Sequence, residues 1–246
     1  VWHPEQQGRQ MIRDAAFNVR KGEIVGIAGL MGAGRTELAM SIFGHAYGRN
    51  ISGTVKMGGK VVDTSSVTRA IAAGLAYVTE DRKQLGLVLD EPIVRNITLA
   101  NLAGVATRGV LSRGREQQVA EEYRRAMSIR TPSVFQKVVN LSGGNQQKVV
   151  LSKWLFADPQ VLILDEPTRG IDVGAKFEIY TIMKDLAAQG RGVVMISSEM
   201  PELLGMCDRI YVMNEGRIVG ELSRDEASQE RIMSLIIRGD GKARVA

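Results

Sequence analysis

The hydrophobic pattern near the start of the chain predicts a strand, a glycine loop and a helix in succession. The apolar run within Glu23–Ala28 indicates a short buried strand. Glycine-rich sequence follows at 29–34, and apolar residues then recur at helical spacing over Thr36–Phe43. Gly44 is a plausible helix stop. This unit is the first place along the chain where a ligand site can be expected.

Alternating and fully apolar runs predict further strands. Two hairpins are expected, one turning at Gly58-Gly59 within residues 51–63 and one turning at Asn214–Gly216. The second would join Arg209–Met213 to Arg217–Leu222. Buried strands are predicted at Gly74–Val78, Val161–Leu164 and Val193–Ile196.

Helical patterns lie between and after these strands. Residues 85–140 are dominated by them, and the clearest is Arg113–Met127, which is heavily charged with a narrow apolar stripe. A helix is predicted at 144–157, and another over Lys176–Ala188. The expected apolar face of the latter is Phe177, Tyr180, Met183 and Ala187. Strands alternating with helices favour an α/β fold with a mainly parallel sheet, and residues 85–140 are best interpreted as a helical insertion.

Composition narrows the function classes. With 246 residues, 44% of them hydrophobic and 24% charged, the chain has ordinary globular composition, which excludes disorder for its bulk. Its single cysteine, Cys207, excludes a disulfide framework and a cysteine-based zinc site. No apolar run approaches the length of a membrane helix. Because the chain begins with Val1, we expect it to be a piece of a longer protein. The charges behind the net value of +5 are scattered, with short clusters at Glu121–Arg125 and in the basic tail at Arg238, Lys242 and Arg244, and we interpret them as a solvated surface.

The glycine loop has the pattern of a phosphate-binding loop. Gly29-Leu-Met-Gly-Ala-Gly34-Arg35-Thr36 fits G-x-x-x-x-G-K-[ST] except that Arg35 replaces the lysine. Glycines let the backbone wrap a phosphate chain closely, so that its N–H groups and the helix N-terminus bind the anion. Thr36 supplies a hydroxyl for Mg²⁺. The competing dinucleotide pattern fails because Glu37 stands where its third glycine must be.

A second motif is the acidic end of the predicted strand Val161–Leu164. Asp165 at the strand tip can hold Mg²⁺, and Glu166 can orient or deprotonate an attacking water. An acidic turn at a strand end is common by itself, but its occurrence in the same chain as the phosphate loop favours a hydrolytic site.

A third motif opens the next helix. In Leu141-Ser-Gly-Gly-Asn-Gln-Gln-Lys148, Ser142 can cap the helix and the two glycines allow a close approach to an anion. This string resembles the signature motif of the ATP-binding-cassette ATPases. It precedes Asp165 in the order that family requires, and Thr168–Asp172 resembles the D-loop that follows the acidic strand.

Further segments narrow the resemblance. The phosphate loop continued to Glu37, Thr79–Lys83, the signature motif and Ile196–Met200 together resemble the second, C-terminal cassette of bacterial monosaccharide importers of the ribose, galactose, xylose and multiple-sugar type. In that subfamily two cassettes are fused in one polypeptide. The resemblance implies a RecA-like P-loop core with a small antiparallel β-subdomain and an inserted helical subdomain. The divisions would be 1–84 for core and β-subdomain, 85–140 for the insertion and 141–246 for the continued core.

The resemblance also implies a mechanism and a set of site residues. Head-to-tail cassette pairs hold ATP and Mg²⁺ between the phosphate loop of one cassette and the signature helix of the other, and closure of the pair drives membrane partners. The implied partners are an N-terminal cassette, a membrane permease and, indirectly, a periplasmic sugar-binding protein, at the cytoplasmic face of the bacterial inner membrane and without nucleic acid. The implied nucleotide-binding residues are Gly29, Leu30, Met31, Gly32, Ala33, Gly34, Arg35, Thr36 and Glu37. Mg²⁺ would be held by Thr36 and Asp165, with Glu166 catalytic. The partner nucleotide would meet Ser142, Gly143, Gly144, Asn145 and Gln146, and the D-loop would be Gly170, Ile171 and Asp172.

Three positions depart from the family pattern. Arg35 replaces the loop lysine, Glu80 stands at the Q-loop glutamine, and Ser198 or Ser197 stands at the switch histidine. Both histidines of the chain are far away in sequence. We therefore expect this cassette to bind Mg-nucleotide but to turn it over poorly, while its signature helix completes the competent site of its partner. The isolated chain would be a weak ATPase or none.

Two other functions stay open at this stage. One is a non-catalytic, allosteric nucleotide-binding cassette. The other is a soluble cassette ATPase acting on DNA or ribosomes, which is disfavoured because residues 85–140 are too short for a coiled-coil insertion and show no interleaved basic and aromatic residues. Trp2 is the candidate for the aromatic residue that would stack on the base, because Phe17 fits a core pattern.

Overall fold

The computed structural model describes residues 1–238, so Lys242 and Arg244 of the predicted basic cluster lie outside the described residues. The chain divides into two compact units. The first comprises Val1–Tyr77, Gln160–Glu166 and the chain from Lys184 onward, and the second comprises Val78–Pro159 and Pro167–Met183. The boundaries of these units do not coincide with the predicted divisions at 84/85 and 140/141, which stay a prediction.

The first unit is built on a sheet with the strand order β10-β9-β1-β8-β7-β4. Strand β1 pairs in parallel with both β8 and β9, β7 pairs in parallel with β8, and β10 is antiparallel to β9. The strands are β1 (Ile24–Gly29), β4 (Leu75–Val78), β7 (Val161–Asp165), β8 (Gly192–Ile196), β9 (Arg209–Asn214) and β10 (Arg217–Ser223). This parallel-dominated α/β sheet confirms the predicted fold class.

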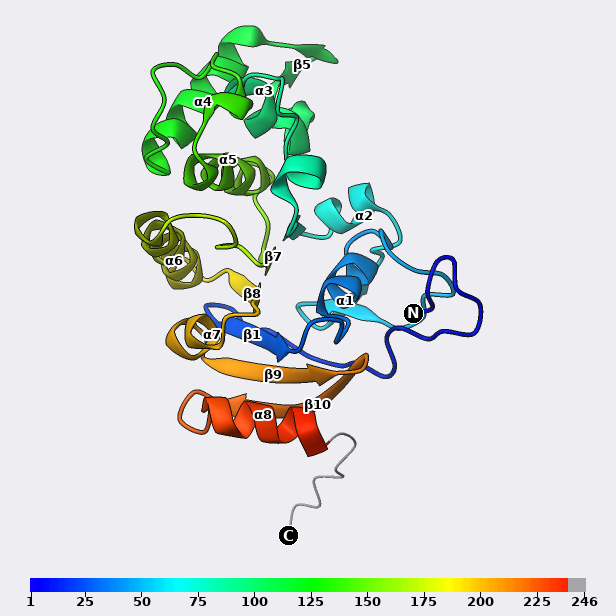
Figure 1. The fold of residues 1–246 in the computed structure, drawn as a ribbon. Helices are drawn as coiled ribbons and strands as arrows, with labels where there is room; N and C mark the ends of the chain where they lie inside the picture. The colour runs from blue at the N-terminus through cyan, green and yellow to red at the C-terminus, as the bar shows by residue number, and fades with distance from the viewer. Residues whose placement is uncertain (239–246) are drawn as a thin grey trace. The chain divides into compact units, whose positions relative to one another are not determined.

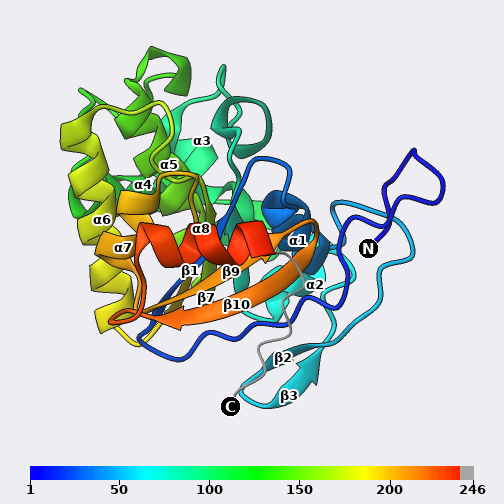
Figure 2. The ribbon, with the colours of Figure 1, turned by 60° about the horizontal axis from the view of Figure 1, so that its bottom comes forward.

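The strands in the middle of this sheet are apolar along most of their length, because both of their faces are covered. Every residue of β8 is buried, as are all residues of β7 except the first. The helices that lie entirely within this unit are α1 (Arg35–Ile42), α2 (Val67–Ala72), α7 (Met200–Met206) and α8 (Gln229–Arg238). Helix α8 lies along β9 and β10, as Figures 1 and 2 both show.

The two predicted hairpins are present. Strands β2 (Val55–Met57) and β3 (Lys60–Val62) turn at Gly58-Gly59, both of which have positive φ, and form the small antiparallel sheet visible in Figure 2. Strands β9 and β10 turn at Glu215-Gly216. A Cβ on Gly216 would lie 1.9 Å from the Met11 carbonyl oxygen, so this turn needs glycine for space as well as for conformation.

The second unit is mainly helical. It contains α3 (Ile93–Thr98), α4 (Arg113–Ala126) and α5 (Gly143–Leu155), which pack together in Figure 1, and the short hairpin of β5 (Ala106–Thr107) and β6 (Val110–Leu111). The π-helical turn η1 (Arg82–Gly86) and the 3-10 helices η2 (Leu99–Val105) and η3 (Val138–Asn140) connect them. The helical character predicted for residues 85–140 is therefore confirmed, and so is the helix expected at Arg113–Met127.

Helix α6 (Val173–Ala188) begins in the second unit and ends in the first. It starts three residues earlier than predicted, and one assignment to its apolar face was wrong. Phe177 is 66% exposed, whereas the buried positions are Ile179, Met183, Leu186 and Ala187. Phe177 and Ile179 differ by about 200° around a helix, so the two cannot share a face.

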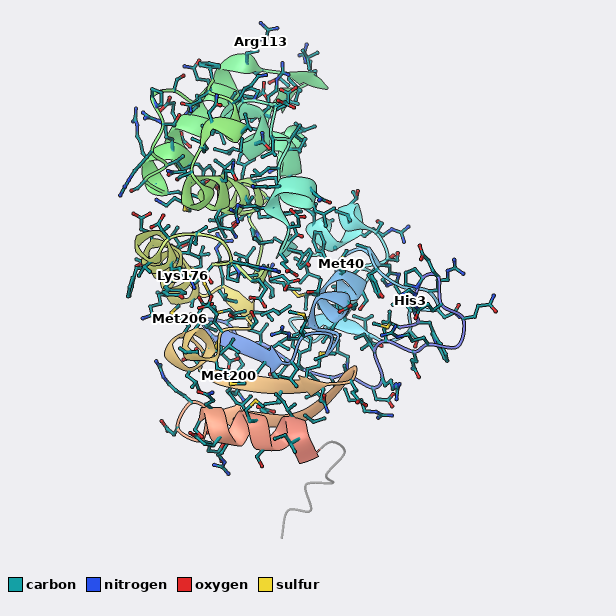
Figure 3. All side chains as sticks on the ribbon, viewed as in Figure 1. His3, Met40, Arg113, Lys176, Met200 and Met206 are labelled. Carbon is teal, nitrogen blue, oxygen red and sulfur yellow. The ribbon has the colours of Figure 1, made fainter. Side chains whose placement is uncertain are left out.

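Three methionines lie in or next to α7 and β9 of the first unit. Met206, at the end of α7, and Met213 are buried, and Met200 at the start of α7 is half-buried (Figure 3). Within residues 1–238, none of the helices combines the length and the apolar character that crossing a bilayer requires.

Candidate functional site

The glycine loop joins β1 to α1 in the first unit and is shaped by three glycines. Gly34, immediately before α1, has φ of 98°, and Gly32 has φ of 80°, which are values that side chains disfavour. A Cβ on Gly29 would lie 2.6 Å from the Met213 carbonyl oxygen, so the loop lies directly against β9. A Cβ on Gly32 would meet nothing within 4 Å, so this part of the loop faces open space. The loop backbone is therefore open at Gly32, whereas Ala33 and Gly34 are buried.

The N-terminus of α1 follows this loop. Its first amides have no partner inside the helix, because the i−4 carbonyls they would use lie before the helix begins. Arg35 and Thr36 are the first two residues of α1, and Leu38 donates to the Gly34 carbonyl. This is the arrangement of backbone donors that binds phosphate at a helix N-terminus.

Asp165 ends β7 beside this helix and is fully buried. Its Oδ2 accepts a hydrogen bond from the Tyr77 hydroxyl at 2.8 Å. Its Oδ1 is buried with no hydrogen-bond partner among the described residues. Burial raises the pKa of Asp165, and hydrogen bonding from Thr36 and Tyr77 partly opposes the rise.

These residues fit a magnesium ion. An unpartnered, buried carboxylate oxygen next to a threonine hydroxyl provides hard oxygen ligands, which Mg²⁺ prefers. A cation there would also compensate the buried negative charge. Thr36 and Asp165, the two ligands expected from the sequence, therefore lie together.

Glu166 and Arg35 face each other at the same end of the sheet. Arg35 Nη2 lies 3.6 Å from Glu166 Oε1, and both side chains are only 10% exposed. Arg35 Nη1 donates to the Ser197 carbonyl oxygen at 2.7 Å. The loop cation is thus directed to the end of β8 and to the acidic pair.

The second oxygen of Glu166 is engaged as well. Ser198 Oγ donates to Glu166 Oε2 at 3.0 Å. Ser197 is buried and its hydroxyl donates to Glu202 instead, at 2.8 Å. Of the two serines proposed at the switch position, Ser198 is therefore the one that reaches Glu166.

The signature helix α5 lies in the second unit and begins after Ser142. The expectation that Ser142 caps the helix through its side chain was wrong. Its hydroxyl makes no hydrogen bond to the backbone of the first turn, and it accepts instead from Asn145 Nδ2 at 2.9 Å. The two are one turn apart, which brings their side chains together.

The two signature glycines are needed for packing. A Cβ on Gly144 would lie 2.5 Å from Ala175 Cβ on α6. A Cβ on Gly143 would lie 2.8 Å from Arg82 Nη2 and 3.1 Å from the Gly170 carbonyl oxygen. These glycines therefore let α5 approach α6 and the segment before it closely.

Two other signature side chains point into the second unit. Gln146 is 5% exposed, donates to the Val138 carbonyl oxygen at 3.2 Å and accepts from Arg82 at 3.4 Å. Asn145 Oδ1 accepts from the Arg130 backbone N–H at 2.9 Å.

The predicted D-loop is held by the Thr79–Lys83 segment. Arg82 donates to the carbonyl oxygens of Arg169 and Gly170 at 3.0 and 3.4 Å, and Glu80 forms an ion pair with Arg169. Gly170 has φ of 68°. Asp172 Oδ1 accepts from the Ala175 N–H at 2.9 Å and so caps α6. Ile171, between them, is half-buried.

Trp2 lies in the N-terminal segment of the first unit, where it forms backbone bridges to Gln10 and Arg49. Its side chain is half-buried. His3, labelled in Figure 3, follows it and makes an edge contact with Tyr47 at 6.3 Å between ring centroids. Phe17 is also half-buried and packs edge-on against Tyr211.

Comparison with known protein families places the chain in a family. The family model described as ABC transporter matches residues 12–169. The chain belongs to the ABC transporter family. The matched range contains the phosphate loop, the signature motif and the acidic end of β7 of this ABC cassette.

Curated relatives are similar over nearly all of this ABC cassette. The L-arabinose transport ATP-binding protein AraG of Geobacillus stearothermophilus is 60% identical over 238 residues, which are 97% of this chain and 46% of that protein. The xylose import ATP-binding protein XylG of Geobacillus kaustophilus is 55% identical over 96% of this chain and 46% of its own length. The chain thus spans about half the length of these relatives.

Solved structures share the fold of this ABC cassette. The ADP conformation of MJ1267, an ATP-binding cassette of an ABC transporter, superposes with a TM-score of 0.74 over 93% of both chains at 20% sequence identity. This similarity supports the RecA-like P-loop core predicted for the first unit.

Sequence reasoning missed three residues of this ABC cassette that organise its motifs. Tyr77 holds Asp165, Arg82 links the signature helix to the D-loop, and Lys148 forms an ion pair with Glu178 on α6. A tyrosine at the end of a buried strand was a signal for the first. The other two had none, because their partners come from distant parts of the sequence.

Proposed function

We propose that this chain is the second cassette of a bacterial monosaccharide importer and that its own nucleotide site is degenerate. It would be fused to an N-terminal cassette and act peripherally at the cytoplasmic face of the inner membrane with a permease and, indirectly, a periplasmic sugar-binding protein. The 60% identity to an L-arabinose transport ATP-binding protein supports the sugar-import assignment. That protein is more than twice as long as the match, which is consistent with two fused cassettes.

The observation that carries the proposal is the contact between Arg35 and Glu166. In this cassette the loop cation and the prospective general base are paired, and Ser198 occupies the other oxygen of the same carboxylate. A base whose oxygens are already engaged is poorly placed to accept a proton from water. This arrangement supports nucleotide binding with slow turnover.

Each part of the site has a defined task under this proposal. The amides of the loop and of α1 bind the phosphates of ATP, and Thr36 and Asp165 hold Mg²⁺. The metal ion, when bound, neutralises charge on the phosphates. The signature helix, with Ser142 at its N-terminus, serves the nucleotide held by the partner cassette.

A non-catalytic, allosteric cassette is the second candidate, and the same Arg35–Glu166 pair favours it. The two candidates share the fold and differ only in whether this site turns over ATP. Action on nucleic acid has no comparable support, because the relatives reported above are named for sugar transport.

Nucleotide affinity and turnover of loop variants test the proposal. ATP binding with Mg²⁺ should be lost in Arg35→Ala and retained in Arg35→Lys, because a lysine ammonium still binds phosphate. Arg35→Lys should raise turnover in the complete transporter if the loop cation causes the degeneracy. Unchanged affinity in both variants would show that the loop is not the principal site. Rapid Mg-dependent turnover by the isolated chain, abolished by Glu166→Gln, would show that the site is not degenerate.

A further inference from the structure

The side chains of Ser142 and Asn145 form a pair at the exposed N-terminus of α5. Ser142 is exposed, while Asn145 is half-buried and turned back toward it. The distance of 2.9 Å from Asn145 Nδ2 to Ser142 Oγ makes this a hydrogen bond with the amide as donor.

The orientation of the Asn145 amide is determined by its other partner. Its Oδ1 lies 2.9 Å from the backbone nitrogen of Arg130, which can only donate. The oxygen must therefore face Arg130, and the NH₂ group must face Ser142. The Ser142 hydroxyl consequently acts as an acceptor toward Asn145.

The segment that carries Arg130 is itself held in place. Ile129 is buried, and Lys148, which is 2% exposed, donates to the Ser128 carbonyl oxygen at 3.0 Å. Lys148 also pairs with Glu178, whose other oxygen lies 3.4 Å from Arg130 Nη2. The segment whose backbone N–H orients Asn145 is thus anchored by the buried Lys148.

We propose that Asn145 is a positioning residue that makes the Ser142 hydroxyl a hydrogen-bond donor to the phosphate of the nucleotide bound by the partner cassette. This inference rests on the proposed function, because it assumes that α5 serves that nucleotide. A hydroxyl has one hydrogen, and Asn145 occupies a lone pair of the oxygen without using that hydrogen. Ser142 Oγ makes no other hydrogen bond within the described chain, so the hydrogen is available for an anion. Asn145 acts on the nucleotide only through Ser142.

The substitution Asn145→Asp reverses the direction of the hydrogen bond between residue 145 and Ser142. In Asn145→Asp one carboxylate oxygen still accepts from Arg130, but the other must accept from Ser142 and turns its hydrogen inward. Asn145→Ala merely frees the hydroxyl to rotate. Aspartate also places a negative charge near the phosphate, and this separate effect must be measured where no hydroxyl is present.

A double-mutant cycle in the complete transporter tests the assignment. The variants are Ser142→Ala, Asn145→Ala, Asn145→Asp and both double substitutions, with Gln118→Ala on the exposed face of α4 as the control amide. The measurements are kcat and KM for ATP, with thermal unfolding of each variant to establish that it folds.

We expect Asn145→Ala to raise KM by about threefold to tenfold, as for one neutral hydrogen bond, and Asn145→Asp to raise it further. In the Ser142→Ala background Asn145→Ala should have almost no additional effect, and Asn145→Asp should retain only the effect of its charge. Equal effects of Asn145→Ala in the two backgrounds would overturn the assignment and point to a direct contact of Asn145 with the nucleotide. Unchanged kinetics in Ser142→Ala alone would overturn the proposed function, and the assignment with it.

Discussion

At the scale of single residues, the charged groups of the site differ in whether they have a partner. Arg35 and Glu166 neutralise one another, whereas Asp165 is buried with one oxygen lacking a partner among the described residues. Two adjacent carboxylates of one motif thus have different tasks. Glu166 is restrained by its ion pair, and under the proposed function Asp165 holds a cation.

The charge of Asp165 should reduce stability when no metal ion is bound. Burial raises the pKa of Asp165 in the folded state, so the folded state favours the protonated carboxyl group. As pH rises through this pKa, the buried group becomes charged and the folded state loses stability. Asp165→Asn should therefore increase the unfolding free energy at neutral pH by roughly 1–3 kcal/mol, and the gain should vanish in acid. Denaturant unfolding without Mg²⁺ at several pH values measures this. A destabilised variant at neutral pH would contradict the account, as would Mg-dependent nucleotide binding that survives the substitution.

At the scale of elements, helix α5 is connected to its surroundings by contacts that differ in kind. Its first turn needs glycine to approach α6, and its last turns carry Lys153, which is buried and donates to the Gly86 carbonyl oxygen in η1 at 2.6 Å. The first contact depends on the absence of a side chain and the second on a long one.

Adding a methyl group at Gly144 should separate these helices. Gly144→Ala would place Cβ 2.5 Å from Ala175 Cβ, so we expect a loss of about 1–3 kcal/mol from overpacking. Gly114→Ala in α4 is the matched control, because nothing lies within 4 Å of its Cβ position and alanine favours a helix by up to about 1 kcal/mol. Thermal or denaturant unfolding compares the two. Equal stability changes would mean that the close approach at Gly144 is not required.

Lys153 should give stability a distinctive pH dependence. Burial lowers the pKa of Lys153 to about 8. Between that value and the ordinary lysine pKa, the unfolded chain binds more protons than the folded chain, so stability should rise with pH in this window. The contribution should be at most on the order of 3 kcal/mol. The contribution of Lys153 is isolated by comparing the unfolding free energies of the natural chain and Lys153→Met from pH 7 to about 10.5. A constant difference would exclude this titration.

At the scale of the whole molecule, the chain distributes its motifs over two compact units. The phosphate loop, Asp165 and Glu166 belong to the first unit, whereas Glu80, the signature helix and the D-loop belong to the second. The chain passes from one unit to the other directly after Glu166. Under the proposed function, the phosphate loop and the acidic pair of the first unit serve one nucleotide, and the signature helix of the second unit serves the other.

Substitutions in the two sets should therefore have unequal effects on the complete transporter. Ser142→Ala should reduce ATP turnover by at least about tenfold, because it removes a hydrogen bond to a charged phosphate at the competent site. Glu166→Gln in this chain should change turnover little, since its own site contributes little hydrolysis. Steady-state ATPase assays on both variants measure the contrast. Abolished turnover in Glu166→Gln would mean that the site of this chain is catalytic.

Much of the fold could be predicted from local pattern. The run Val161–Leu164 in β7 is apolar at every position, and the turn at Gly58-Gly59 has residues that accept positive φ, so short-range physics was sufficient. The motifs of the candidate site were readable for the same reason. A phosphate loop and a strand ending in two carboxylates are each contiguous in sequence, and their chemistry depends on local backbone shape.

Tertiary structure decided which side chains meet. The sequence contains no signal that Arg35 turns toward Glu166, that Asn145 holds Ser142, or that Gly144 makes room for Ala175. Phe177 illustrates the same limit, because an apolar residue on a helix is buried only if another element covers it. Local sequence governs backbone conformation through torsional preference and hydrophobic period. Contacts between side chains depend on distances that are established only when remote segments of the chain pack together.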